Sequence, residues 1–332
     1  MEVLKIGILV IVIIVSVFFG IYCKVYKKHI FDNVSYKCYF DTTEVYQGED
    51  ILFIEEVSNG KYLPMPWLKA ELTTSKYLNF SDKCSVVTYK SRFVSSCYAL
   101  EGNKSVKREW KISASKRGVF SIDNVVLTSC DIFATNEVSK AINNVKTSIT
   151  VLPIEIDSPD IDKTIDYIWG EYQTRRNLLT DAFTMRGIKE YTGHERLNRV
   201  HWKGSAKQSN LMVIDEDYTS NVNVVIYLYI QDNCEETLAE KTLSMACTIA
   251  VRLSEGNVPT KLDTNCNVNT STSFGKAHAL NIKRTCARVE LSPVSYSVPN
   301  VDGNSILIIV TPMINKSKFE SYKDNQIVLV RL

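Results

Sequence analysis

The feature that most restricts how this chain can fold is an uncharged, mainly apolar stretch near its amino terminus, Ile6–Tyr22 (IGILVIVIIVSVFFGIY). A helix that crosses a bilayer needs about 20 such residues, and somewhat shorter runs also suffice. Lys5 and Lys24 flank the stretch, where their ammonium groups can reach the headgroups, and tyrosine is favoured at the interface. We therefore expect residues 1–28 to form a transmembrane anchor, with residues 6–22 in the membrane.

Other roles for this apolar stretch fit less well. A cleaved signal peptide requires a small-residue cleavage site, which the segment Gly20-Ile21-Tyr22-Cys23 does not offer. A lipid anchor on Cys23 would require a small residue before it, and Tyr22 is large. A core helix without a polar face is unusual so early in a chain. The membrane anchor is therefore the favoured interpretation.

The charges that flank the stretch predict its orientation. Lys5, which Glu2 offsets, precedes it, whereas Lys24, Lys27 and Lys28 follow it. Because positively charged flanks stay inside, we expect a single-pass protein of the cell membrane whose large carboxyl-terminal part is cytoplasmic. The nine cysteines agree with a reducing compartment. Their number is odd and no Cys-x-x-C occurs, so neither a disulfide framework nor a zinc site is indicated.

Residues 33–155 show short runs of strand-forming residues, the clearest of which is Val106–Ala114. Val106, Trp110, Ile112 and Ala114 fall on one face of that run at a period of two. We expect further strands at residues 51–54, 85–89, 118–128 and 149–152, separated by turn signals such as Gln47-Gly48 and Asn59-Gly60. Roughly six or seven strands in this length predict an antiparallel, immunoglobulin-like β-sandwich domain.

Residues 156–332 show a different pattern. Val222–Ile230 and Ser305–Thr311 are nearly continuous apolar runs, typical of strands covered on both faces. Shorter strands are expected at 258–262 and 326–332, and helices at 235–255, ended by Gly256, and at 276–289. Alternation of strands and helices predicts a parallel α/β sheet. The acidic, proline-containing segment 153–162 is expected to be the junction between the two parts.

Charged and aromatic residues are concentrated between these patterns, in the segment Phe183–Val213. Three interpretations are open. Ion pairs of Arg199 and Lys203 with glutamates, and burial of Trp202 and Tyr191 between domains, would make the segment structural. Arginine and tryptophan would equally suit a surface that binds a partner. The candidate residues for either role are Arg186, Glu190, Tyr191, Glu195, Arg199, Trp202, Lys203 and Ser205.

The third interpretation of the segment is catalysis. His194, Glu195 and His201 are residue types for acid–base chemistry, and Ser205 or a cysteine is a candidate nucleophile for a hydrolase. However, the sequence contains no Gly-x-Ser-x-Gly, no His-Glu-x-x-His and no phosphate-binding loop. We therefore expect no catalytic residues, and the hydrolase remains an alternative.

The same segment resembles the signature of the domain of unknown function 58 family, roughly R-E-Y-x-P-G-D-x-x-R-x-I-x-W-K-x-S-A-R. The matching positions are Glu190-Tyr191, Glu195, Arg199, Val200, Trp202-Lys203 and Ser205-Ala206. Asn59–Leu68 (NGKYLPMPWL) and Lys116–Phe133 resemble two upstream motifs of the family, in the right order. His194-Glu195 stands where the family has Gly-Asp, and Asn198 stands where it has arginine, so the turn that needs the glycine is expected to differ.

The resemblance implies that residues 156–332 combine the signature segment with a Rossmann-type domain similar to von Willebrand factor A. Such domains bind Mg²⁺ through an Asp-x-Ser-x-Ser that follows the first strand. In this chain Asp232 is not followed by serines at that spacing, so we expect no metal and no cofactor.

The resemblance also implies a setting. Members of the family commonly occur with MoxR-type AAA ATPases and with transglutaminase-like membrane proteins. The expected function is therefore a membrane-anchored, non-enzymatic adaptor that works with such an ATPase in envelope protein assembly or maturation. With 39 basic and 37 acidic residues, no nucleic-acid binding is expected. An extracytoplasmic adhesion domain, with the opposite orientation, is a further alternative.

Overall fold

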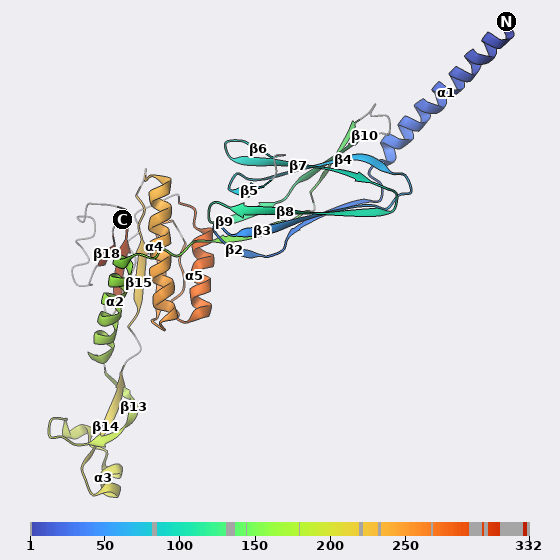
Figure 1. Ribbon diagram of the computed structural model, residues 1–332. Coiled ribbons are helices and arrows are strands. Elements are labelled where there is room, and N and C mark those ends of the chain that lie inside the picture. Colours follow the sequence, from blue (N-terminus) through green and yellow to red (C-terminus); the bar gives the residue numbers. More distant parts are fainter. Residues whose placement is uncertain are drawn as a thin grey trace. The chain divides into compact units, whose positions relative to one another are not determined.

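The computed structural model describes the 332-residue chain except residues 1, 82–84, 131–136, 144, 179, 219–221, 232–233, 267, 292–300, 302–304, 313–327 and 331–332. The chain divides into two compact units, Met1–Pro153 and Ile154–Leu332. Figure 1 shows their elements, and each unit is described by itself.

The first unit begins with helix α1 (Glu2–His29). From Leu9 to His29 this helix is long and apolar enough to cross a membrane, with a mean hydropathy of 2.4 and most of its surface exposed. Its last turn carries Lys27, Lys28 and His29, and the positive charges of the two lysines suit the negative end of the helix dipole. The apolar stretch is thus a helix with the dimensions and composition of a membrane span.

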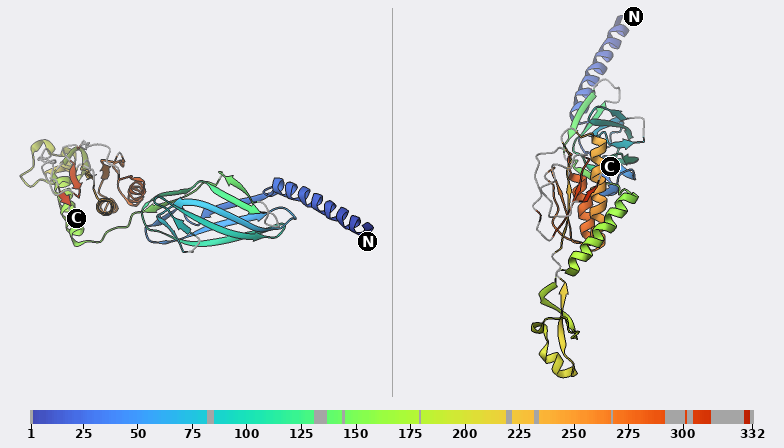
Figure 2. Two further views of the ribbon diagram at one scale, coloured as in Figure 1. Left: turned by 90° about the horizontal axis from the view of Figure 1, so that it is seen from above. Right: turned by 90° about the vertical axis from the view of Figure 1, so that its left-hand side faces the viewer.

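The rest of the first unit is built from strands that form three sheets around one hydrophobic core (Figures 1 and 2). The strands are β1 (Val34–Phe40), β2 (Glu44–Tyr46), β3 (Asp50–Asn59), β4 (Met65–Ser75), β5 (Leu78–Phe80), β6 (Ser85–Val87), β7 (Ser91–Leu100), β8 (Lys104–Ala114), β9 (Gly118–Ile122), β10 (Val125–Cys130), β11 (Glu137–Ile142) and β12 (Thr147–Leu152).

The sheet orders are β1-β3-β8-β5, β11-β10-β4-β7-β6 and β2-β12-β9. The strands pair antiparallel, except that β2 and β12 run parallel. The predicted antiparallel, sandwich-like architecture is confirmed. The expectation of six or seven strands was too low, because short edge strands such as β2 and β5 leave little trace in the hydrophobic pattern.

Alternation of side chains explains which face of each strand is buried. On β8, Trp110, Ile112 and Ala114 are at most 5% exposed, as expected. Val106 is 36% exposed, so it lies outside the core although it shares their phase. The single strand expected at residues 118–128 is wrong. It is two strands, β9 and β10, in different sheets, interrupted at Asp123-Asn124.

The second unit contains a parallel sheet of β15 (Val224–Leu228), β16 (Thr260–Thr264), β17 (Ile306–Val310) and β18 (Val328–Val330), in the order β16-β15-β17-β18. Helices α4 (Glu236–Glu255) and α5 (Lys276–Arg288) share one core with a face of this sheet. The parallel sheet expected from the alternating pattern is present.

The carboxyl end of α4 differs in one detail from the expectation. Gly256 follows the helix but has a φ of −71°, so it does not adopt the left-handed conformation expected of a capping glycine. The left-handed residue is its neighbour Asn257, with a φ of 61°. Asparagine tolerates this conformation better than most residues.

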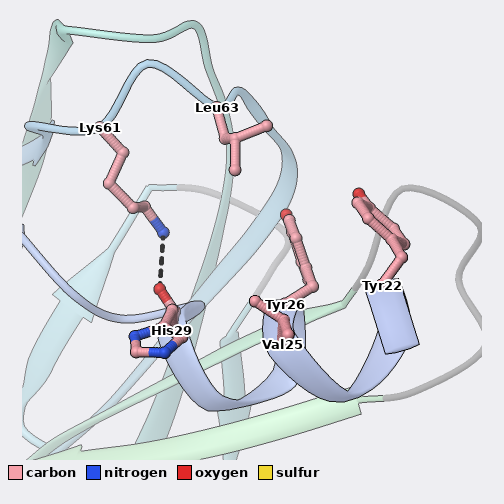
Figure 3. A pocket seen from close by; sticks show the side chains of 6 residues that line it. All are labelled: Tyr22, Val25, Tyr26, His29, Lys61 and Leu63. Atoms are coloured by element: carbon pink, nitrogen blue, oxygen red, sulfur yellow. Dashed lines mark hydrogen bonds between the residues drawn. The ribbon is translucent and has the colours of Figure 1, made fainter. Parts of the chain in front are cut away.

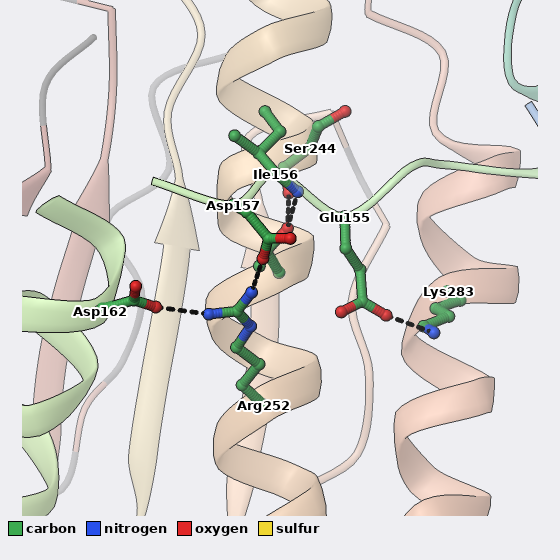
Figure 4. Close-up of polar contacts among 8 residues, drawn as sticks. Glu155, Ile156, Asp157, Asp162, Ser244, Arg252 and Lys283 are labelled. Carbon is green, nitrogen blue, oxygen red and sulfur yellow. Dashed lines mark hydrogen bonds and ion pairs between the residues drawn. The ribbon is translucent and has the colours of Figure 1, made fainter. Parts of the chain in front are cut away.

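The expected junction, 153–162, is not an open linker. Figure 4 shows that side chains of this segment form polar contacts with α4 and α5. Arg252 of α4 donates to Asp162 at 2.6 Å and also to Asp157, and Lys283 of α5 forms an ion pair of 2.6 Å with Glu155. The segment leads into helix α2 (Pro159–Leu178), which the hydrophobic pattern did not predict. Ile161, Ile168 and Tyr172 of α2 belong to the same core as α4.

Candidate functional site

The densely charged segment forms an antiparallel hairpin of β13 (Thr180–Glu190) and β14 (Met212–Tyr218). The connection between the strands carries a short 3-10 helix, η1 (Leu197–Arg199), and helix α3 (Trp202–Gln208). We refer to residues 180–218 as the signature hairpin (Figure 1). It contains every candidate residue from Arg186 to Ser205; the side chain of Arg186 lies outside the described part of the structure.

Hydrogen bonds from Ser205 and His201 close the connection onto β14. The Ser205 hydroxyl accepts from the Met212 N–H at 2.8 Å and donates to the His201 carbonyl at 3.1 Å. The His201 N–H donates to the Met212 carbonyl at 2.8 Å. The His201 ring, through Nδ1, accepts from the Gly204 N–H at 2.9 Å and so caps helix α3. Both residues therefore shape the loop.

The turn after β13 is organised by Glu195. Its carboxylate accepts from the N–H and the hydroxyl of Thr192, each at 3.0 Å. The Thr192 N–H is the main reason that the pKa of Glu195 lies below its usual value. Gly193, with a φ of 92°, provides the positive-φ residue of this turn. The family motif has its glycine at the position of His194. In this chain the glycine of the turn is Gly193, one position earlier.

The carboxylates of this segment have partners other than Lys203. Glu195 contacts Thr192 and, at 3.8 Å, the ammonium group of Lys189. Glu190 accepts from the Asn210 side chain at 3.2 Å. Among the residues that the structure describes, Lys203 takes part in no ion pair. The ion pairs expected between these glutamates and Arg199 or Lys203 stay a prediction, and so does the structural interpretation of the segment.

Large apolar side chains are exposed on the signature hairpin. Trp202 is 71% exposed and Leu197 is 68% exposed, so neither is buried within its own unit. Met185, Ile188 and Leu211 are also exposed. Among the hairpin side chains that the structure describes, the buried apolar ones are Val200, Met212 and Val213. Leu197 and Trp202, the two most exposed of these side chains, both belong to the connection between β13 and β14.

The three residues considered for acid–base catalysis have separate surroundings. His194 is exposed, Glu195 is held by Thr192, and the His201 ring accepts from a backbone N–H. The Ser205 hydroxyl is engaged with the backbone of His201 and Met212. Within the described contacts, no hydrogen bond joins His194, Glu195 and His201 to one another, as a catalytic group would require.

The carboxyl edge of the parallel sheet is where α/β proteins commonly bind ligands. Asp232, the residue considered for a metal, lies outside the described residues. Nearby, the buried Asn265 amide accepts from the Ile230 N–H at 3.1 Å and donates to the Ile230 carbonyl at 2.6 Å. The described residues contain no group of three or more His, Cys, Asp or Glu that could hold a metal ion.

A cluster of polar side chains that we did not predict lies inside the sandwich. Glu55, on β3, is 0% exposed and accepts hydrogen bonds from Ser96 at 2.7 Å, Tyr98 at 2.8 Å, Trp110 Nε1 at 2.5 Å and Tyr36. These partners come from strands β1, β7 and β8, so the cluster joins two sheets. Four donors match the roughly four acceptor positions of a carboxylate.

The Glu55 cluster changes the acid–base behaviour of its neighbours. Burial, reinforced by the Glu55 carboxylate, raises the pKa of the Tyr36 and Tyr98 hydroxyls. The same two causes raise the pKa of the Cys38 thiol to about 12. A signal was present in the sequence, since Glu55 is in phase with the inward-facing Phe53 and Val57. A glutamate at that phase predicts a buried, hydrogen-bonded carboxyl group.

No protein-family model and no curated protein matches the chain. Solved structures similar to part of it include a non-cellulosomal cohesin from Archaeoglobus fulgidus, which is 14% identical with a TM-score of 0.25 and covers 39% of this chain and 97% of the cohesin. A CARDB domain from Pyrococcus furiosus is 13% identical with a TM-score of 0.24, covering 37% and 90%. The sporulation control protein Spo0M of Bacillus subtilis is 14% identical with a TM-score of 0.22, covering 48% and 58%. Similarity at this level assigns neither a family nor a function to the chain.

Proposed function

We propose that this protein is a membrane-anchored, non-enzymatic adaptor that binds a partner protein through the signature hairpin. The observation that carries the proposal is the exposure of Trp202 and Leu197 on a loop that its own hydrogen bonds hold in shape. Tryptophan is prominent among the residues that dominate binding energy at interfaces. A loop that is already ordered loses little entropy when it binds.

We further propose that the chain is a divergent member of the domain of unknown function 58 family. The three motifs around Asn59–Leu68, Lys116–Phe133 and the signature hairpin support this assignment. The strand order of the parallel sheet is β16-β15-β17-β18, so β15, the first of these strands in the sequence, lies between β16 and β17. This order is compatible with a degenerate von Willebrand A-like domain. The partner that this membership favours is a MoxR-type AAA ATPase, with a transglutaminase-like membrane protein as a second component.

The adaptor proposal is tested by co-purification of the tagged full-length protein in detergent. The parent is expected to retain an ATPase, and Trp202→Ala and Leu197→Ser are expected to lose most of it. Phe274→Ala is the matched control, because Phe274 is 58% exposed in the same unit but lies outside the hairpin. Retention of the ATPase by both hairpin variants, or its absence from the parent, would contradict the proposal.

For topology, we propose that α1 spans the cell membrane with the sandwich and the α/β unit in the cytoplasm. The lysines that follow the apolar stretch support this orientation. The exposed thiol of Cys97 allows a direct test. A membrane-impermeant maleimide should label it in inside-out vesicles and not in intact cells, with Cys97→Ser as the control for labelling elsewhere. Labelling of Cys97 in intact cells would reverse the orientation.

A further inference from the structure

Helix α1 does not end before the sandwich but enters it. Tyr26 and Ile30 are 6% and 2% exposed and belong to the sandwich core. The Lys61 ammonium group donates to the carbonyl of His29 at 3.4 Å and to that of Ile30, which satisfies acceptors left open at a helix end. The end of the helix is thus fixed to the loop that follows β3.

That loop, Gly60–Pro64, is held in one conformation. The buried Asn59 side chain donates to the Leu63 carbonyl at 2.9 Å and accepts from the Lys61 N–H at 3.2 Å. A Cβ atom on Gly102 would lie 2.2 Å from the Tyr62 carbonyl oxygen, so the turn between β7 and β8 approaches the loop as only glycine permits. Its shape is therefore set before anything binds to it.

The loop presents apolar side chains that the sandwich does not cover. Tyr62 is 93% exposed and Leu63 is 50% exposed. Leu63 lines a hollow of about 170 Å³ together with Tyr22 and Val25 of α1 (Figure 3). The hollow is also lined by His29, so Leu63 lies beside the last two turns of α1, which follow the apolar stretch.

This position determines what lies next to the loop when α1 is in a bilayer. The eight helical residues from Tyr22 to His29 span about 12 Å. Lys24, Lys27 and Lys28 lie in this segment, where ammonium groups meet lipid phosphates. The loop lies in the same zone, and tyrosine is a residue type enriched there.

We propose that the Gly60–Pro64 loop is a second membrane contact, in which Tyr62 and Leu63 insert into the interfacial region of the bilayer beside α1. The inference rests on the proposed membrane span but not on its orientation. Whichever side of the membrane the sandwich occupies, the loop meets the interface on that side. The helix and the loop together hold the sandwich against the lipid surface. A single flexible attachment would not fix the domain in this way.

The test uses the full-length protein in phosphatidylcholine vesicles, with or without bromine on the upper part of the acyl chains to quench nearby tryptophan. Tyr62→Trp and Tyr89→Trp are compared with the parent. Tyr89 is the matched control, because it is 83% exposed and precedes β7, whereas the Tyr62 loop lies beside the turn that follows β7. The emission added by Tyr62→Trp should be blue-shifted and lost in brominated vesicles, and that of Tyr89→Trp should not.

Two failures of this test are distinguishable. If alkaline carbonate extracts the protein from vesicles, α1 does not span the membrane and the anchor proposal fails. If the protein resists extraction but the emission of Tyr62→Trp is quenched no more than that of Tyr89→Trp, the loop contact is wrong and the anchor stands. Quenching of Tyr62→Trp alone supports both, and it does so without a partner protein present.

Discussion

The Glu55 cluster and the signature hairpin use the same kinds of side chain for different ends. Each combines glutamate with tyrosine, tryptophan and serine. In the sandwich, Trp110 is 5% exposed and donates to Glu55, which is itself fully buried. On the hairpin, Trp202 is 71% exposed. The difference teaches that residue type does not decide between structure and binding; burial and hydrogen-bond satisfaction do.

The largest expected effect is the loss of the Glu55 acceptor. Glu55→Ala leaves four buried donors without their partner, and each orphaned donor costs about 1–3 kcal/mol. We expect a loss of about 4 kcal/mol or more in the stability of the sandwich, measured by hydrogen exchange of β3, β7 and β8 in the full chain. Glu56→Ala, on the outward side of β3, should change it by less than about 0.5 kcal/mol. Equal effects of the two variants would refute the structural role of the cluster.

The two tryptophans give the sharpest test of the comparison. Trp110→Ala should cost the sandwich about 3–5 kcal/mol, because it empties part of the core and removes a hydrogen bond to Glu55. Trp202→Ala should cost the signature hairpin less than about 0.5 kcal/mol, because its side chain is mostly in solvent. Hydrogen exchange of each region reports both values. A large loss of protection in β14 on Trp202→Ala would make Trp202 structural instead.

A smaller effect is expected within the hairpin. Ser205→Ala removes the acceptor of the Met212 N–H and should destabilise the closed loop by about 1 kcal/mol. Faster hydrogen exchange at the Met212 amide is the measurement. Lys203→Ala, in the same helix, is the control and should leave that amide unchanged. An unchanged rate in Ser205→Ala would show that this hydrogen bond does not close the loop.

The smallest effect concerns pH. The pKa of Glu195 lies below its usual value of 4.5, chiefly because the Thr192 N–H donates to the carboxylate. The sign follows from linkage: this interaction stabilises the turn above pH 4.5 and is lost as the pH falls through the lowered pKa. Thr192→Val removes the hydroxyl donor and should move the pKa back toward 4.5, as an NMR titration of the Glu195 side chain would show. A parent pKa at or above 4.5 would contradict the observed contact.

Local patterns in the sequence predicted much of the architecture. The apolar stretch before Lys24 became α1, the period-two run at Val106–Ala114 became β8, and helical spacing at 235–255 became α4. These elements depend on residues that are close along the chain, so their periodicity is visible without the fold. Helix α2 was not predicted because its sequence is polar on most faces. Packing against α4 stabilises this helix in the folded protein.

Two features were decided only by the tertiary structure. The donors to Glu55 are separated from it by 41, 43 and 55 residues for Ser96, Tyr98 and Trp110, and sheet pairing alone brings them together. The signature hairpin was visible as a motif, but the exposure of Trp202 was not. The physical reason is the same in both cases: local sequence fixes which face a side chain takes on its element, whereas burial depends on what the rest of the chain places against that face.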